Sequence, residues 1–213
     1  MNIHERGAMK TGCLIAAGVV IVLVLVLGMS LVGRYNGLVT MQEKVEAAWS
    51  EIDNQYKRRF DLVPQLVSTV QGAADFEKST ITEVTEARAS VGRAQLPPGV
   101  PQDPAQLEAY AQAQQGLGAA LSRLLVVVER YPELKASANF LALQDQLEGT
   151  ENRIAVARRD YIDAVRQYNT GRRRFPTNLI AGMFGFDTVP QMQIDSGERE
   201  TPQVDFDFDK NDG

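Results

Sequence analysis

The stretch "VEAAWSEIDNQYKRRFDLVPQLVSTV", residues 45–70, decides the fold class of this chain of 213 residues. Its apolar residues return every three or four positions, which is the spacing of one face of an α-helix. Two residues interrupt the pattern: Arg59 occupies a place in the apolar row, and Pro64 removes a backbone N–H donor inside the helix. We therefore predict an amphipathic helix with a buried charge and a bend. The predicted row is Val45, Trp49, Ile52, Tyr56, Arg59, Val63, Leu66 and Val70.

Three more helices are predicted downstream. Gly72 ends the first helix, and a shorter helix follows at about 76–91. The loop "LPPGVPQDP", residues 96–104, is rich in residues that cannot continue a helix, and Asp103 at its end is a typical N-cap for the third helix. The fourth helix starts near Pro132. Its large apolar residues repeat every seven positions, as in coiled coils: Phe140, Leu147, Ile154, Tyr161 and Tyr168.

This pattern predicts an all-α chain, with a single N-terminal transmembrane helix followed by an antiparallel, up-down-up-down four-helix bundle of long helices. Such a bundle places two "YN" pairs, Tyr35-Asn36 and Tyr168-Asn169, level with each other at one end. In a three-helix alternative, residues 38–91 form one kinked helix of about 80 Å, and the pairs lie far apart. The predicted divisions are a short tail (1–13), a span (14–33), the bundle (34–186) and an acidic, disordered tail (187–213).

The segment from Thr11 to Gly33 contains no charged residue, and its centre, "LIAAGVVIVLVLVLGMSLV", is long enough to cross a bilayer as a helix. It is too long for the apolar run of a signal peptide, and no small-residue cleavage site precedes Arg34. We therefore predict an uncleaved, single-pass anchor in the inner membrane. The basic residues on the two sides of the span nearly balance, and the short N-terminal tail favours an extracytoplasmic bundle.

Charge and composition exclude several classes of protein. Seven acidic and two basic residues lie from Asp195 onward, so this tail carries the whole net charge of −5. The rest of the chain is neutral and offers no basic field for nucleic acid. The single histidine, His4, and the single cysteine, Cys13, both precede the span or lie at its start. We therefore predict no metal, no cofactor and no enzymatic activity. A cryptic hydrolase that uses carboxylates remains the alternative.

The buried arginine needs a partner. With the two YN pairs level, Arg59 lies opposite about Gln144, one helical turn from Glu148 and two from Glu151. A buried guanidinium is tolerated when a carboxylate accepts its hydrogen bonds. We predict that Arg59, or its neighbour Arg58, pairs with Glu148 and fixes the alignment of the helices.

Two further features are candidates for interaction. Asp61 precedes Pro64 by three residues, like a cap on a helix that restarts, and the bend either shapes the bundle or acts as a hinge. The segment "RRRFPTNLIAGMFGF", residues 172–186, either lies on anionic lipid or folds back and caps the bundle. Tyr35 and Asn36 follow the span directly and are expected in its interfacial collar. The candidate residues of the segment are Arg172, Arg173, Arg174, Phe184 and Phe186.

The sequence resembles the LemA family. The resemblance rests on the span followed by "YNGLV" and "VEAAWSEID", on "RRFDLVPQLVSTVQGAADFE", on the run from "YPELKASANF" to "VRQYN", and on "FPTNLIAGMFGF". It implies a membrane-anchored antiparallel bundle in bacteria, linked to envelope stress or membrane organisation, and it implies no reaction. The family tends to repeat "YN" in the last helix, whereas this chain has Tyr161-Ile162 at the first of these places.

We therefore expect a scaffold or adaptor of the bacterial envelope that presents its bundle for protein–protein contact or self-association. The expected partners are membrane lipid, other envelope proteins and further copies of this chain. Besides the hydrolase, the remaining alternative is a stress sensor with a hinge at Pro64.

Overall fold

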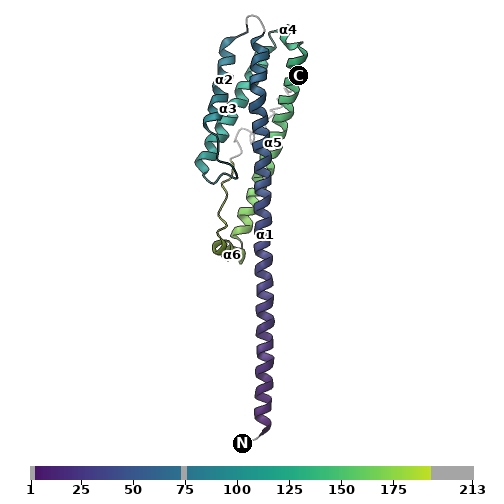
Figure 1. The fold of residues 1–213 in the computed structure, drawn as a ribbon, viewed down its shortest axis with the longest axis vertical. Helices are drawn as coiled ribbons and strands as arrows, with labels where there is room; N and C mark the ends of the chain where they lie inside the picture. Colours follow the sequence, from purple (N-terminus) through teal and green to yellow (C-terminus); the bar gives the residue numbers. More distant parts are fainter. Residues whose placement is uncertain (1–2, 73–75, 193–213) are drawn as a thin grey trace, which may run out of the picture.

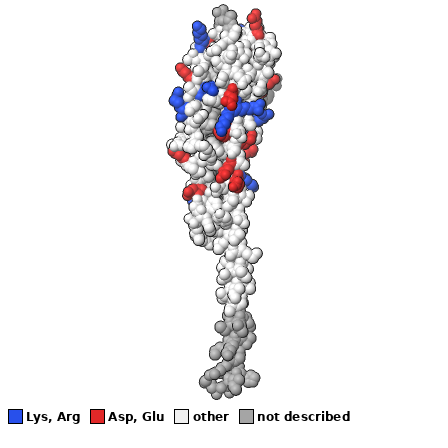
Figure 2. Space-filling model, viewed as in Figure 1, with Lys and Arg blue, Asp and Glu red and all other residues white. Residues whose placement is uncertain are grey.

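Helix α1 (Ile3–Gln71) runs without interruption from the apolar segment into the helical domain (Figure 1). The computed structural model describes the backbone of residues 3–72 and 76–192, with side chains from residue 17 on. Every large apolar side chain from Val19 to Val32 is more than half exposed. On the face drawn in Figure 2, charged side chains lie over the helical domain, and the white part of the stalk carries none. Such a continuous apolar surface has the length and composition of a membrane span.

Five helices follow α1 within residues 76–192, and the helices pack in pairs. α1 packs along α5 and α2 along α3, while α6 lies against both α1 and α5 (Figure 1). The described residues contain helices, turns and loops but no strand, which confirms the all-α prediction. The break after Gln71 excludes the alternative in which residues 38–91 form one helix. The five helices are α2 (Lys78–Arg93), α3 (Pro104–Val128), α4 (Pro132–Lys135), α5 (Ala138–Arg173) and α6 (Thr177–Phe184).

The predicted rows form the core. Every residue of the row on α1 is buried, including Arg59, which is only 3% exposed. The seven-residue row on α5 is buried along its whole length. Side chains from α1, α2, α3 and α5 belong to one contiguous apolar cluster, so the pairs α1–α5 and α2–α3 share a core. Burial of these rows is the main favourable term that holds the helices together.

Three contacts along α1 and α5 define an antiparallel alignment. A Cβ atom on Gly171 would lie 2.7 Å from Met41 Sδ. The glycine therefore permits close approach of α5 to α1 at the end of the domain nearest the apolar segment. The rings of Trp49 and Tyr161 lie 5.4 Å apart. Farther along, Arg59 Nη1 lies 2.8 Å from an oxygen of Glu151. As the residue number rises along α1, the number of the partner on α5 falls in step.

The two tyrosines of the YN pairs lie at the same end of the domain but not at the same level. Tyr35 packs its ring on Phe184 and Phe186, with centroids 4.9 and 5.6 Å away. Tyr168 donates a hydrogen bond of 2.8 Å to the carbonyl of Asp187. The predicted alignment was therefore wrong by about one heptad, because α1 enters the helical domain at Tyr35 beside α6 and the segment that follows it rather than beside α5.

We predict that Asp103→Ala lowers the free energy of unfolding by about 1 kcal/mol. The Asp103 carboxylate accepts a hydrogen bond of 2.9 Å from the backbone N–H of Ala105, which otherwise has no partner in the first turn of α3. Ser137→Ala is the matched control, because Ser137 is the N-cap of α5 but makes no capping bond with its side chain. Chemical denaturation of both variants measures the difference. Equal losses would contradict the capping role of Asp103.

Candidate functional site

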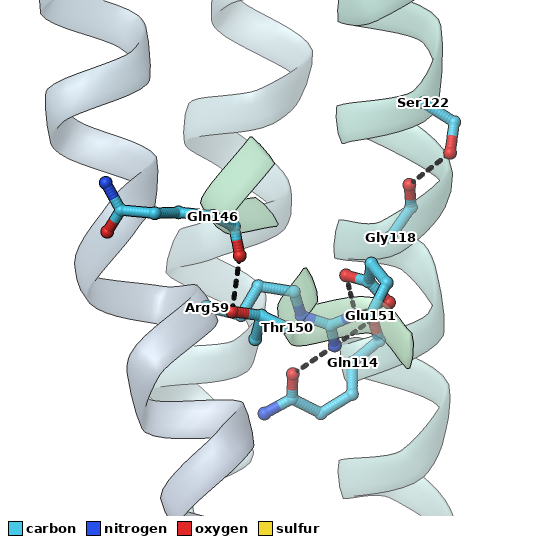
Figure 3. Close-up of polar contacts among 7 residues, drawn as sticks. All are labelled: Arg59, Gln114, Gly118, Ser122, Gln146, Thr150 and Glu151. Carbon is cyan, nitrogen blue, oxygen red and sulfur yellow. Dashed lines mark hydrogen bonds and ion pairs between the residues drawn. The ribbon is translucent and has the colours of Figure 1, made fainter. Parts of the chain in front are cut away.

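The Arg59 cluster, made of Arg59, Gln114 and Glu151, is a buried polar site where three helices meet (Figure 3). Arg59 Nη1 donates to both carboxylate oxygens of Glu151, at 2.8 and 3.1 Å. Arg59 Nη2 donates to the backbone carbonyl of Gln114 at 2.8 Å and to its side-chain Oε1 at 2.6 Å. One side chain from α1 is thus bound to α5 and to α3 at once.

The surroundings of the guanidinium are tightly packed. Gly118 on α3 lies beside it, and a Cβ there would lie 3.4 Å from Arg59 Nη1, at van der Waals contact. The ring of Tyr56 contacts the guanidinium carbon at 5.3 Å from its centroid, a cation–π arrangement. Arg59 Nε is buried and has no hydrogen-bond partner among the described residues. The two terminal nitrogens therefore carry the polar contacts of this charge.

The predicted partner of Arg59 was wrong. Glu148 is exposed and accepts a hydrogen bond from Gln144 on its own helix, while Glu151, one turn farther along α5, binds Arg59. Arg58 is exposed on the outer face of α1. Sequence reasoning overlooked the role of Gln114, although a signal was present, because Gln114 is a polar residue inside the apolar row of α3 and is only 2% exposed.

An aromatic layer lies next to the Arg59 cluster. Tyr110 packs on Tyr56 at 5.7 Å and on Trp49 at 6.4 Å between ring centroids. Burial raises the pKa of Tyr110 to about 12. Burial also raises the pKa of Tyr56 and of Tyr161 above the ordinary value. These hydroxyls stay protonated at neutral pH, so the layer is polar at its edges but uncharged.

A groove of about 280 Å³ opens beside this layer. Its lining includes Trp49 and Tyr56 of α1, Tyr110 of α3 and the loop residues 95–99. Its polar lining residues are Asp53 and Lys57, which bind each other at 2.6 Å, and the amides Gln95 and Gln114. The groove can accept a small apolar group, and its charged margin is already paired within α1.

Pro64 provides a contact between α1 and α2. A proline cannot donate to the carbonyl four residues earlier, which is that of Phe60. Arg88 on α2 replaces the missing donor, since its Nε donates to Phe60 O at 3.3 Å. The guanidinium of Arg88 also lies 3.8 Å from the centroid of the Phe60 ring. α1 continues through Pro64, so the prediction that Asp61 caps a restarted helix was wrong; Asp61 is exposed. No sequence signal pointed to Arg88.

The strap, residues 185–192, runs back along α5 after α6. Asn169 binds it like a neighbouring peptide unit: its Nδ2 donates to Val189 O at 2.8 Å, and its Oδ1 accepts from Val189 N at 3.1 Å. Tyr168 and Arg172 hydrogen-bond to the carbonyls of Asp187 and Phe186. Residues 187–192 were assigned to the acidic tail, yet Val189 and Met192 are buried here; the rest of that tail, 193–213, lies outside the described residues.

The segment 172–186 has two different faces. Ile180 and Ala181 of α6 are buried against the domain, as the capping alternative predicted. On the other side, the apolar residues are exposed, and so are Arg173 and Arg174. Asn36 is exposed beside Tyr35, and its carbonyl accepts a hydrogen bond from Thr40. The exposed apolar residues are Phe175, Leu179, Met183 and Phe184.

No group of three or more histidine, cysteine, aspartate or glutamate side chains within residues 17–72 and 76–192 is placed to hold a metal ion. The cluster around Arg59 has the composition of a structural polar node, with one cation, one carboxylate and one amide. Its chemistry is the pairing of the buried Arg59 charge with the partly exposed Glu151 carboxylate and with the oxygens of Gln114.

Comparison with known proteins places this helical domain in a family. Residues 48–206 match the model of the LemA family, which covers most of the chain. The chain belongs to the LemA family. The match includes the Arg59 cluster, the strap and α6, and it confirms the resemblance seen in the sequence.

Several curated proteins are similar over the same region. Magnetosome protein MamQ 2 of Paramagnetospirillum magneticum is 29% identical over 77% of this chain and 66% of its own length. Magnetosome protein MamQ of Magnetospirillum gryphiswaldense is 26% identical over 75% of this chain and 65% of its length. Protein LemA of Metamycoplasma hominis is 27% identical over 79% of this chain and 73% of its length. The chain thus spans about two thirds of the MamQ proteins.

We predict that Glu151→Ala lowers the free energy of unfolding by about 1–3 kcal/mol. Removing one partner of a fully buried ion pair costs about 3–5 kcal/mol, and the loss is smaller here because the Glu151 side chain is 41% exposed to screening solvent. Glu148→Ala on the same helix is the control and should cost less than about 0.5 kcal/mol. Urea denaturation measures both. A larger loss for Glu148→Ala would contradict the pairing.

We also predict that the free energy of unfolding falls as the pH rises above about 10. An unfolded tyrosine ionises near pH 10, whereas the folded chain keeps the proton of Tyr110 up to a pKa of about 12. The unfolded state therefore gains stability from ionisation between these values, by about 3 kcal/mol at most for Tyr110. Denaturation midpoints should fall less steeply with rising pH for Tyr110→Phe than for the parent chain. A slope unchanged by that substitution would contradict the assignment.

Proposed function

We propose that this LemA-family protein is a membrane-anchored scaffold or adaptor of the bacterial envelope. Its helical domain is a four-helix, up-down-up-down bundle that presents surfaces to other envelope proteins or to further copies of the chain. The anchor is the apolar part of α1, which crosses the inner membrane once, and the bundle lies on the extracytoplasmic side.

The observation that carries the proposal is the continuity of α1. The same helix contains the exposed apolar stretch Val19–Val32 and the buried row from Val45 to Val70. A helix without a break transmits position and orientation, whereas a flexible linker would let the bundle tumble. The bundle is therefore held at a fixed distance from the span and turns only together with the anchor helix, which suits a protein that positions others.

The Arg59 cluster supports the same role. It binds α5 and α3 to α1 through one side chain, so the relative positions of the helices are defined. A scaffold needs such definition, because the surface it presents is composed of residues from several helices. Surfaces available for contact include exposed apolar side chains on two different helices, Val126 on α3 and Val156 on α5, which are 71% and 49% exposed.

The relatives give the proposal its biological setting. Proteins named as magnetosome proteins and a protein named LemA share this region at 26–29% identity. We extend from them only the general property of a helical protein associated with membranes.

Photocrosslinking in native membranes tests the proposal. A photoreactive amino acid is introduced into the full-length chain at Val126 or Val156, and at the exposed charged residue Glu108 of α3 as the control. We expect discrete adducts from at least one apolar position and weaker adducts from Glu108, because interface cores are depleted of charge. Mass spectrometry then distinguishes a foreign partner from a second copy. Equal, diffuse labelling at all three positions would indicate random collision and contradict a scaffold.

A further inference from the structure

The exposed face of α6 and the turn before it is an apolar surface in contact with water. Phe175 is 81% exposed, Leu179 57%, Met183 79% and Phe184 61%. Leu179 and Met183 are four residues apart and therefore lie on the same side of the helix. The opposite side is already used, since Ile180 and Ala181 are buried against the domain. The segment thus caps the domain with one face, while its other apolar side chains remain exposed apart from the ring contact of Phe184 with Tyr35.

The position of α6 relative to the apolar end of the span is fixed by Tyr35. This residue follows Val32 by three positions, which is about 4–5 Å along a helix. The ring of Phe184 lies 4.9 Å from the ring of Tyr35, so α6 lies at the same height as the first residues beyond the span. Interfacial helices place their apolar faces about 5–10 Å into the boundary between headgroups and acyl chains. The height of α6 matches this layer.

Exposed arginines lie at this end of the domain, together with one exposed carboxylate of the strap, Asp187. Arg34 on α1 and Arg173 and Arg174 at the end of α5 are all exposed, and none of them forms a salt bridge with a described acidic residue. Arginines next to an apolar surface bind the phosphates of anionic headgroups while the apolar side chains enter the acyl boundary. A soluble partner would need to match both features in the narrow space next to the bilayer.

We propose that α6 docks on the bilayer surface and forms a second membrane attachment beside the anchor, with Leu179, Met183 and Phe184 in the interfacial layer and Arg173 and Arg174 on anionic headgroups. This inference rests on the proposed anchor, because the height argument counts from the span. Two attachments at one end restrict the tilt and rotation of the bundle, which a single helix would leave free.

Depth-dependent fluorescence quenching tests the docking. The full-length chain with Cys13→Ser receives one cysteine at Met183, at Val24 in the span, or at Val126 on α3, each labelled with an environment-sensitive dye. The variants are reconstituted into vesicles of phosphatidylcholine and phosphatidylglycerol whose acyl chains carry bromine at shallow or deep positions. We expect loss of fluorescence at Met183 mainly with shallow bromine, at Val24 mainly with deep bromine, and none at Val126.

The outcomes separate the two proposals. Quenching at Val24 without quenching at Met183 would leave the anchor intact and overturn the docking of α6. Absence of quenching at Val24 would overturn the anchor and the docking together. A blue-shifted but unquenched dye at Met183 would assign this face to a second copy of the chain and overturn lipid docking.

The role of the arginines is tested with the same Met183 label. Arg173→Gln combined with Arg174→Gln should reduce quenching in vesicles that contain phosphatidylglycerol and leave it unchanged in phosphatidylcholine alone. Arg153→Gln, an exposed position of α5 inside the domain, is the matched control and should change neither. Quenching that does not depend on phosphatidylglycerol in the parent chain would overturn the assignment of these arginines to anionic headgroups.

Discussion

The buried charge of Arg59 is the constraint on which the alignment of the helices depends. Removing a guanidinium from water costs several kcal/mol unless acceptors inside the protein replace the water. Here Glu151 satisfies one terminal nitrogen and Gln114 the other. Since the acceptors belong to α5 and α3, neither helix can slide along α1 without leaving a charged group unpaired. The polar cluster thus converts packed helices into a defined arrangement.

The apolar rows alone could not achieve this. Large residues recur every seven positions on α5, so a slip of one heptad would again place apolar side chains against the row of α1. The slip would, however, bring either Gln144 or Arg158 opposite Arg59 in place of Glu151. A similar slip of α3 would replace Gln114 with Leu107 or Leu121. Of the alignments that bury the same apolar surface, only the observed one gives the guanidinium both a carboxylate and an amide.

Because alignments one heptad apart bury the same apolar surface, some predictions from the sequence were confirmed and others were wrong. The buried row of α1, the break after Gln71 and the cap at Asp103 follow from local chemistry, and each is confirmed. The alignment of α1 with α5 was wrong by about one heptad, because periodicity determines it only to within seven residues. The packing of the strap on α5 was not predicted. Tyr168 and Asn169 bind backbone carbonyls of the strap, and backbone groups produce no periodic pattern of side chains in the sequence. Pro64 indicates that the carbonyl of Phe60 lacks its helical donor, but no pattern in the sequence indicated that Arg88 donates to it.

The distribution of polar and apolar groups favours a positioning role over a chemical one. A catalytic cluster keeps a group free to face the substrate, whereas both oxygens of Glu151 and both terminal nitrogens of Arg59 already bind within the protein. A substrate that displaced Gln114 or Glu151 would also release the contact that aligns the helices. Chemistry at this cluster would therefore conflict with the stability of the fold. Exposed apolar side chains lie instead on α3, α5 and α6. Those of α6 face outward beside the end of the span, where we propose that this helix docks on the bilayer.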